Sequence, residues 1–105
     1  MRCFGAKQDA LRSLGVAGGD LQLHYVYLLV SLANPVQRYV GVTSDLRTRM
    51  LAHNSGKSPH TAKYRPWRLV TYLAFADRRQ AESFELYLKS GSGHAFARRR
   101  LWPRE

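Results

Sequence analysis

The chain has 105 residues, which suffices for one domain with one hydrophobic core and is too few for two. Hydrophobic residues make up 45% and charged residues 23%, which excludes a disordered chain, and no apolar run approaches the roughly 18 residues of a membrane span. With 17 Lys and Arg against 7 Asp and Glu, the formal net charge of +10 predicts a polyanionic partner and no membrane insertion.

Nucleic acid is the leading candidate for that partner, because lysine and arginine neutralise its phosphates. An acidic membrane surface or an acidic protein is the alternative. Arginine outnumbers lysine, and the planar guanidinium matches phosphate geometry better than an ammonium does. The single cysteine, Cys3, permits no disulfide within the chain and no cysteine-based zinc site. Because no apolar stretch follows Met1, the sequence predicts a cytoplasmic protein without a secretory signal.

The first part of the chain differs from the rest in composition. It contains several glycines and a short stretch, Ala10 to Leu14, that favours at most a frayed helical turn or two. We interpret residues 1–22 as an N-terminal tail that is either disordered or folds only against a partner. Residues 23–102 are then the single folded domain.

Two β-type runs follow, Tyr25 to Val30 and Arg38 to Val42, separated by a loop with turn-forming residues. They predict an antiparallel hairpin. If Tyr27 pairs with Tyr39, the hairpin centres on Ala33 and the two phenols lie side by side on one face. Ordinary cross-strand aromatic packing is the commoner reason for two such tyrosines, and periodicity alone favours it.

A helix is predicted over residues 45–54, with Thr43 or Ser44 as its N-cap. Arg49 and His53 lie four residues apart and therefore share a face of this helix. A basic helix face near two tyrosines is suited to receive a phosphate. A solvated charged face is the usual alternative.

The sequence after this helix predicts a loop, a strand and two further helical segments. A polar, basic loop over residues 60–65 leads to a strand from Trp67 to Phe75 and then to a helix from Asp77 to Lys89. Gly91-Ser92-Gly93 is predicted to stop that helix. The segment from His94 to Leu101 is helix-compatible, and its run of three arginines fits phosphate contact or solubility equally well.

Glu85 has an unusual position on the predicted helix over residues 77–89. It falls at the edge of the apolar stripe formed by Ala81, Phe84 and Leu88, so its carboxylate partly faces the core. Burial of a carboxylate requires a compensating cation or donors, which makes Glu85 a candidate ligand for Mg²⁺ or Mn²⁺. An i,i+4 pair with Lys89 on a solvated shoulder is the alternative, and both remain open.

Taken in order, these features resemble the GIY-YIG nuclease superfamily, in particular its stand-alone, single-domain branch. Tyr25-Val26-Tyr27 stands at the first family motif, with Tyr25 in place of its glycine, and Tyr39-Val40-Gly41 stands at the second. Arg49, His53 and Glu85 follow on predicted helices. The resemblance covers roughly residues 24–101 and implies an α/β fold of the α+β type, a three-stranded antiparallel sheet flanked by helices.

The resemblance also implies roles for five catalytic residues, Tyr27, Tyr39, Arg49, His53 and Glu85. Glu85 would hold Mg²⁺ or Mn²⁺, and Arg49 would stabilise the transition state. Tyr27 would take a proton from the attacking water, with Tyr39 orienting water or phosphate and His53 as an alternative base or relay. Since a free tyrosine has a pKa of about 10, the role of Tyr27 requires Arg49, His53 or the metal to favour its phenolate.

The implied activity is that of a divalent-metal-dependent endonuclease that hydrolyses nucleic-acid phosphodiester bonds. DNA is the expected substrate and RNA the alternative, with low sequence specificity or a preference for structure, because so small a face reads little sequence. A protein partner for targeting is a further expectation. The competing function is a non-catalytic nucleic-acid-binding module on the same scaffold, supported by the net charge and the arginine run.

Overall fold

A computed structural model describes residues 22–104 of the chain. Apart from Gln22, the predicted tail lies outside the described residues. Three strands form one antiparallel sheet in the order β2-β1-β3, namely β1 (His24–Ser31), β2 (Arg38–Thr43) and β3 (Trp67–Phe75). The three strands predicted from the sequence are therefore present, and the hairpin places β1 in the centre of the sheet.

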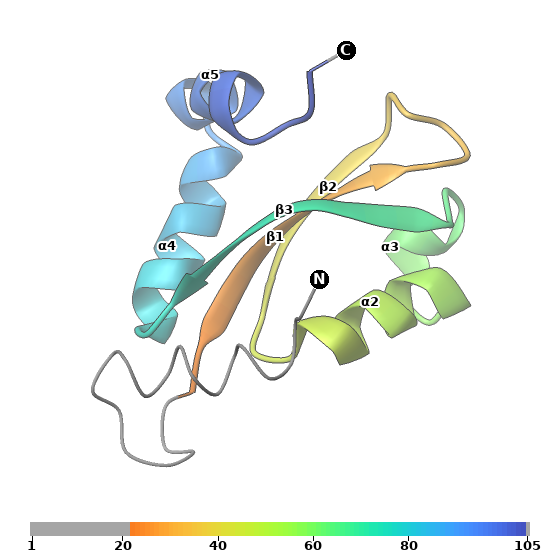
Figure 1. Cartoon of the computed structure of the whole chain (residues 1–105), viewed down its shortest axis with the longest axis horizontal. Coiled ribbons are helices and arrows are strands. Elements are labelled where there is room, and N and C mark those ends of the chain that lie inside the picture. The colour runs from red at the N-terminus through yellow and green to blue at the C-terminus, as the bar shows by residue number, and fades with distance from the viewer. Residues whose placement is uncertain (1–21, 105) are drawn as a thin grey trace, which may run out of the picture.

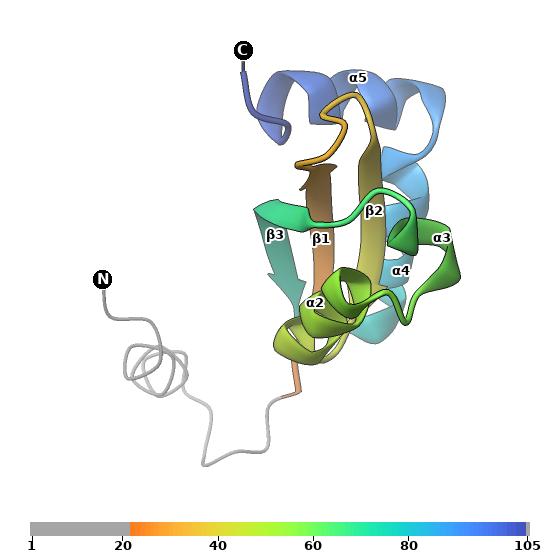
Figure 2. The ribbon, with the colours of Figure 1, turned by 90° about the vertical axis from the view of Figure 1, so that its right-hand side faces the viewer.

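Four helices flank the sheet in two layers. Helices α2 (Leu46–Ser55) and α3 (Pro59–Ala62) follow β2, while α4 (Arg78–Leu88) and α5 (Gly91–Arg100) follow β3 (Figure 1). In the view of Figure 2, α2 and α3 lie in front of the sheet and α4 lies behind it. The predicted α+β architecture is confirmed. Within residues 22–104 no helix has the length and apolarity required to cross a membrane.

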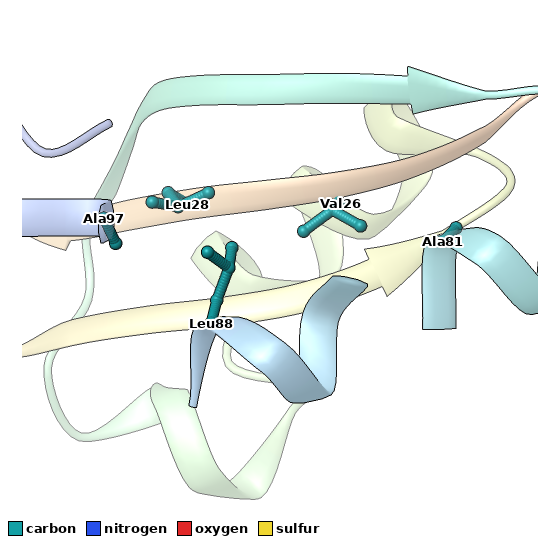
Figure 3. Packing of buried hydrophobic residues seen from close by; sticks show 5 residues of the cluster. All are labelled: Val26, Leu28, Ala81, Leu88 and Ala97. Carbon is teal, nitrogen blue, oxygen red and sulfur yellow. The ribbon is translucent and has the colours of Figure 1, made fainter. Parts of the chain in front are cut away.

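The central strand β1 is buried on both faces, and its side chains alternate between the two layers. Val26 and Leu28 face α4, where they form one core cluster (Figure 3). Tyr27 and Leu29 face the opposite layer and pack with Trp67 at the start of β3. The other members of the first cluster are Ala81, Leu88 and Ala97. This alternation assigns Tyr27 to the layer that contains α2.

The hairpin register differs from the predicted one by two residues. Tyr27 pairs with Gly41, and Tyr39 pairs with Leu29, so the predicted pairing of the two tyrosines is wrong. The shared face is nevertheless correct, because a shift by an even number of residues leaves side chains on the same side of a sheet. Tyr27 and Tyr39 are diagonal neighbours whose ring centroids lie 6.1 Å apart.

Helices α2 and α3 begin where local capping allows. The N-cap of α2 is Asp45, whose carboxylate accepts a hydrogen bond from the Thr48 amide at 3.1 Å, so the predicted caps Thr43 and Ser44 are wrong. A short helix, α3, replaces part of the predicted loop over residues 60–65. It begins after Ser58 with Pro59 in its first position, where the missing amide proton costs nothing.

The segment Gly91-Ser92-Gly93, predicted only to stop the preceding helix, also begins the next one. It ends α4, but Gly91 and Gly93 also form the first turn of α5, which Ser90 caps. A Cβ on Gly93 would lie 1.7 Å from the carbonyl oxygen of Tyr87. Glycine at this position therefore allows α5 to start directly against the end of α4, which directs α5 across the end of the sheet (Figure 1).

Candidate active site

A buried hydrogen-bonded series lies between β1 and α2. The Tyr27 phenol is 2.9 Å from Nε2 of His53, and Nδ1 of His53 is 2.7 Å from Oγ1 of Thr61. Thr61 donates its own proton to the Ser58 carbonyl at 3.4 Å, so its oxygen accepts from Nδ1–H of the imidazole. This leaves Nε2 unprotonated, and Tyr27 donates its hydroxyl proton to it.

Burial determines the protonation of this pair. Tyr27 is 0% exposed and His53 is 1% exposed. Burial first, and the charge of Arg49 second, lower the pKa of His53 below its ordinary value, so the imidazole is neutral at pH 7. Burial and the neighbouring Tyr39 phenol raise the pKa of Tyr27 to about 12, against the hydrogen bond and charge of Arg49, which lower it. Arg49 alone therefore does not favour the phenolate. At pH 7 Tyr27 keeps its proton, and His53 is the group of the two with a free lone pair.

The open side of the site is formed by Tyr39 and Arg49. Arg49 is exposed on α2 and lies within hydrogen-bonding reach of the Tyr27 phenol. Tyr39 is half-buried, and its ring centroid is 4.9 Å from that of His53 in an edge-on contact. Because Tyr27 is fully covered, Arg49 and Tyr39 are the members of this cluster that are accessible from outside.

Several residues that hold this arrangement carried no signal in the sequence. Asn54 clamps the start of β3, since its Oδ1 accepts from the Trp67 amide at 2.6 Å and its Nδ2 donates to the Trp67 carbonyl at 3.2 Å. The indole of Trp67 in turn donates to the Thr61 carbonyl at 2.8 Å. Thr61 lies in a segment that the pattern indicated as a loop, so only its contacts identify it as the partner of His53.

Gly41 provides the space that the Tyr27 ring occupies. A Cβ on Gly41 would lie 2.6 Å from both Cζ and the hydroxyl oxygen of Tyr27, and 2.9 Å from Cε2 of Tyr39. Both rings are packed against His53 and have little freedom to withdraw. The glycine of the second motif is therefore required by the first-motif tyrosine that lies over it.

Substitution of Gly41 by alanine is therefore expected to destabilise the fold by about 1–3 kcal/mol, the usual effect of overpacking a core. Urea unfolding measures this change. Gly91→Ala is the matched control, because a Cβ on Gly91 meets nothing within 4 Å, and it is expected to leave stability unchanged or slightly raised. Equal stability of the two variants would contradict a packing role for Gly41.

Glu85 lies on α4, on the opposite side of the sheet from the cluster of Tyr27, Tyr39, Arg49 and His53. Its side chain is only 12% exposed and is paired with Lys89, which is its single ion-pair or hydrogen-bond partner among residues 22–104. The predicted i,i+4 pair is thus present; Lys89 is 51% exposed, whereas the Glu85 carboxylate is largely covered. Lys89 and Tyr39 line the same hollow along the edge of β2, which connects the partner of Glu85 to Tyr39.

The five predicted residues are therefore brought together unequally. Tyr27, Tyr39, Arg49 and His53 form one cluster, joined by the contacts described above. Glu85 is linked to them only through Lys89 and the hollow.

The donor atoms near Glu85 restrict which metal this region suits. Within residues 22–104 no group of three or more His, Cys, Asp or Glu side chains is placed to hold an ion, so a zinc cage does not fit. A single carboxylate does fit Mg²⁺ or Mn²⁺, which keep several waters and take further ligands from substrate phosphates. The Lys89 ammonium already places a positive charge on this carboxylate, so a metal ion has to displace it.

Fold and site together define a small α+β domain with a polar, arginine-edged site beside a buried histidine. Residues 23–98 match the family model described as the GIY-YIG catalytic domain, and the chain belongs to this family. Membership implies a nuclease that acts on nucleic acid.

Three bacterial relatives are similar over most of the domain. A UPF0213 protein of Lacticaseibacillus paracasei is 38% identical over 69 residues, which cover 65% of this chain and 78% of the relative. UPF0213 proteins of Streptococcus pneumoniae and Bacillus pumilus are 36% and 37% identical, covering 63% and 64% of this chain and 68% and 67% of the relatives. Their shared name states no activity.

Proposed function

We propose that this domain is an endonuclease that hydrolyses phosphodiester bonds of nucleic acid, DNA in the first place, with Mg²⁺ or Mn²⁺ as its cofactor. The observation that carries the proposal is the neutral, buried His53, which accepts the Tyr27 proton beside the exposed Arg49. A histidine that is held neutral and linked through a phenol to an exposed arginine is arranged to accept a proton. A purely structural histidine does not need such a link.

Arg49 and Tyr39 are the groups that contact the scissile phosphate. The guanidinium of Arg49 offers paired donors to two non-bridging oxygens, and its charge stabilises the extra negative charge of the transition state. Tyr39 orients the attacking water or a phosphate oxygen from the other side. Both side chains are accessible to a substrate, since they form the open side of the site.

His53 is the final acceptor of the water's proton. The water oxygen forms a bond to phosphorus as the bond to the leaving oxygen breaks, and the water proton passes to the phenol oxygen of Tyr39, whose own hydroxyl proton passes to the phenol oxygen of Tyr27. In the same step, the hydroxyl proton of Tyr27 moves to Nε2 of His53, so no tyrosinate has to persist. Thr61 remains the acceptor for Nδ1–H throughout. In this form Tyr27 is a relay, which is compatible with its raised pKa.

Glu85 is the carboxylate that holds the divalent ion. When bound, the ion supplies Lewis-acid polarisation of a phosphate oxygen and stabilises the leaving group. Lys89 has to leave Glu85 when the ion binds, and its ammonium is then free to contact phosphate in the hollow along the edge of β2.

A non-catalytic nucleic-acid-binding module is the second candidate. The observation that favours it is the Glu85–Lys89 pair, because a carboxylate neutralised by its own helix does not require a metal ion. This function predicts salt-sensitive binding that chelators do not affect.

The two candidates are separated by incubating the purified protein with labelled duplex, single-stranded and branched DNA and with single-stranded RNA. For the nuclease, cleavage is expected with Mg²⁺ or Mn²⁺ and is expected to stop when EDTA is added. Binding of the same substrates without cleavage under any metal condition would reject the nuclease and support the binding module.

The role of Glu85 is tested by Mn²⁺ binding, measured by electron paramagnetic resonance in the presence of a phosphorothioate oligonucleotide. Glu85→Gln is expected to lose the bound Mn²⁺ signal. Glu82→Gln is the matched control, since Glu82 lies on the same helix, is paired with Arg78 and is 47% exposed. An unchanged Mn²⁺ affinity in the Glu85 variant would remove this residue from the metal site.

A further inference from the structure

A second concentration of positive charge lies where the start of β2 meets the end of α5. An open hollow of about 690 Å³ occupies this corner of the molecule. Five arginines and an indole surround it. They come from the start of β2 and from the end of α5 and the segment after it, and α5 crosses the end of the sheet in Figure 1. The lining residues are Arg38, Arg98, Arg99, Arg100, Trp102, Pro103 and Arg104.

We call this hollow the arginine groove. The segment after α5 that lines it is held in place by hydrogen bonds. The amides of Leu101 and Trp102 donate to the Ala97 carbonyl at 2.8 Å and 2.9 Å, and Thr71 of β3 donates to the Leu101 carbonyl at 2.6 Å. The guanidinium carbon of Arg38 lies 4.8 Å from the centre of the Trp102 ring. The segment after α5 is thereby held against the sheet, and arginines from two distant parts of the sequence face the same space.

The positive charges of the groove are not balanced within the described part of the chain. The ion pairs of Arg78 with Glu82 and of Lys89 with Glu85 use none of its arginines. No carboxylate of residues 22–104 lines the groove. Like charges held this close repel one another, so the groove gains most from a ligand that carries several negative charges.

The arginine groove is continuous with the candidate active site. An adjoining hollow of about 370 Å³ shares Arg38, Arg98 and Trp102 with it. The same hollow is also lined by Tyr39 and Lys89. A strand whose scissile phosphate lies at Tyr39 therefore extends naturally along the edge of β2 towards α5.

We propose that the arginine groove binds the phosphate backbone of the nucleic-acid strand that flanks the cleavage point. This inference rests on the proposed function and adds the path of the substrate to it. Arginine contacts to phosphate position a strand without reading its sequence, so the groove confers affinity and register but no base preference. It also sets a minimum substrate length, because a short phosphodiester reaches the catalytic residues without reaching Arg104.

The test is binding of a fluorescent oligonucleotide, followed by anisotropy in EDTA so that the readout does not depend on cleavage. The double variant Arg100→Gln/Arg104→Gln is expected to bind about tenfold more weakly at low salt. On duplex DNA, the slope of log K against log salt is expected to become shallower by about 0.9 for each phosphate that the variant no longer neutralises.

The matched control is Arg78→Gln/Arg79→Gln, which removes the same charge from the start of α4, the end of that helix away from α5 (Figure 1). It is expected to change affinity less than twofold. Equal weakening in both double variants would mean that only net charge matters, and would overturn the proposal. Absence of binding by the parent protein would overturn it as well. Thermal melting of each variant excludes a folding defect as the cause.

Hydrolysis of bis(p-nitrophenyl) phosphate separates the groove from catalysis, because this small phosphodiester does not span the groove. The groove variant is expected to hydrolyse it at the parental rate. A parallel loss of this activity would place the two arginines in catalysis and contradict the proposal. A further outcome is that the parent protein hydrolyses neither DNA nor the small phosphodiester while the groove variant still binds the oligonucleotide more weakly. In that case the nuclease proposal fails and the assignment of the groove to backbone binding stands.

Discussion

Replacement of Arg49 by alanine is expected to lower the single-turnover cleavage rate about 10²–10³-fold, the usual loss when one preorganised donor to transition-state charge is removed. The physical reason is position, since Arg49 is the exposed cation beside the Tyr27 phenol. The substitution also removes the charge that lowers the pKa of Tyr27, so proton transfer through that phenol becomes harder. Stability is expected to change little, because the side chain is exposed.

Two further variants separate the effect of the Arg49 guanidinium from the effect of losing one positive charge. Arg49→Lys keeps the charge but loses the guanidinium geometry, and is expected to recover only part of the rate. Arg47→Ala, from the same helix, is the control for loss of one positive charge and is expected to retain nearly full activity. Cleavage by Arg49→Ala at the parental rate, with the metal at the same concentration, would exclude Arg49 from the reaction.

The second large effect is expected for His53→Gln, which keeps a polar side chain between Tyr27 and Thr61 but has no basic nitrogen. The rate is expected to fall about 10²-fold or more, as for loss of a general base. Because the pKa of His53 lies below 6.5, the acid limb of the parental rate is expected to be centred below pH 6.5, with a plateau at higher pH. A parental acid limb centred at or above pH 6.5 would contradict this assignment.

The same lowered pKa links stability to pH. Below pH 6.5 the unfolded chain protonates His53 while the folded chain keeps it neutral, so the unfolded state binds more protons. The parental free energy of unfolding is therefore expected to fall as the pH decreases from 6.5 through the folded-state pKa. His53→Gln is expected to lack this part of the acid destabilisation, and urea unfolding at several pH values measures the difference.

In the proposed mechanism Thr61 acts through His53, as a positioning residue. Thr61→Val removes the acceptor for Nδ1–H, which permits the wrong tautomer and is expected to lower the rate and shift the acid limb. Thr61→Ser retains the hydroxyl and is expected to restore the parental pH profile. A purely structural role would instead change stability without moving the profile.

The sequence by itself determined the elements and the faces on which the main residues lie. The strands over 24–31, 38–43 and 67–75 follow from β-branched and aromatic runs between turn residues, and period-2 alternation put Tyr27 and Tyr39 on one face despite a wrong register. Helical spacing likewise put Arg49 and His53 on one face and Glu85 at the edge of an apolar stripe, partly facing the core. Local periodicity is sufficient for each of these because none depends on which elements pack together.

Only the tertiary structure decided which of those residues meet. Thr61 contacts His53 because the short helix α3 returns the chain against α2, which no local pattern encodes. Glu85 lies across the sheet from the tyrosines because α4 packs on the face that carries Val26 and Leu28, whereas α2 packs on the other face. Burial raised the pKa of Tyr27 and lowered that of His53, which is why the proposed mechanism uses His53 as the base. These outcomes depend on packing between distant segments and on the desolvation it causes, and a linear pattern contains neither.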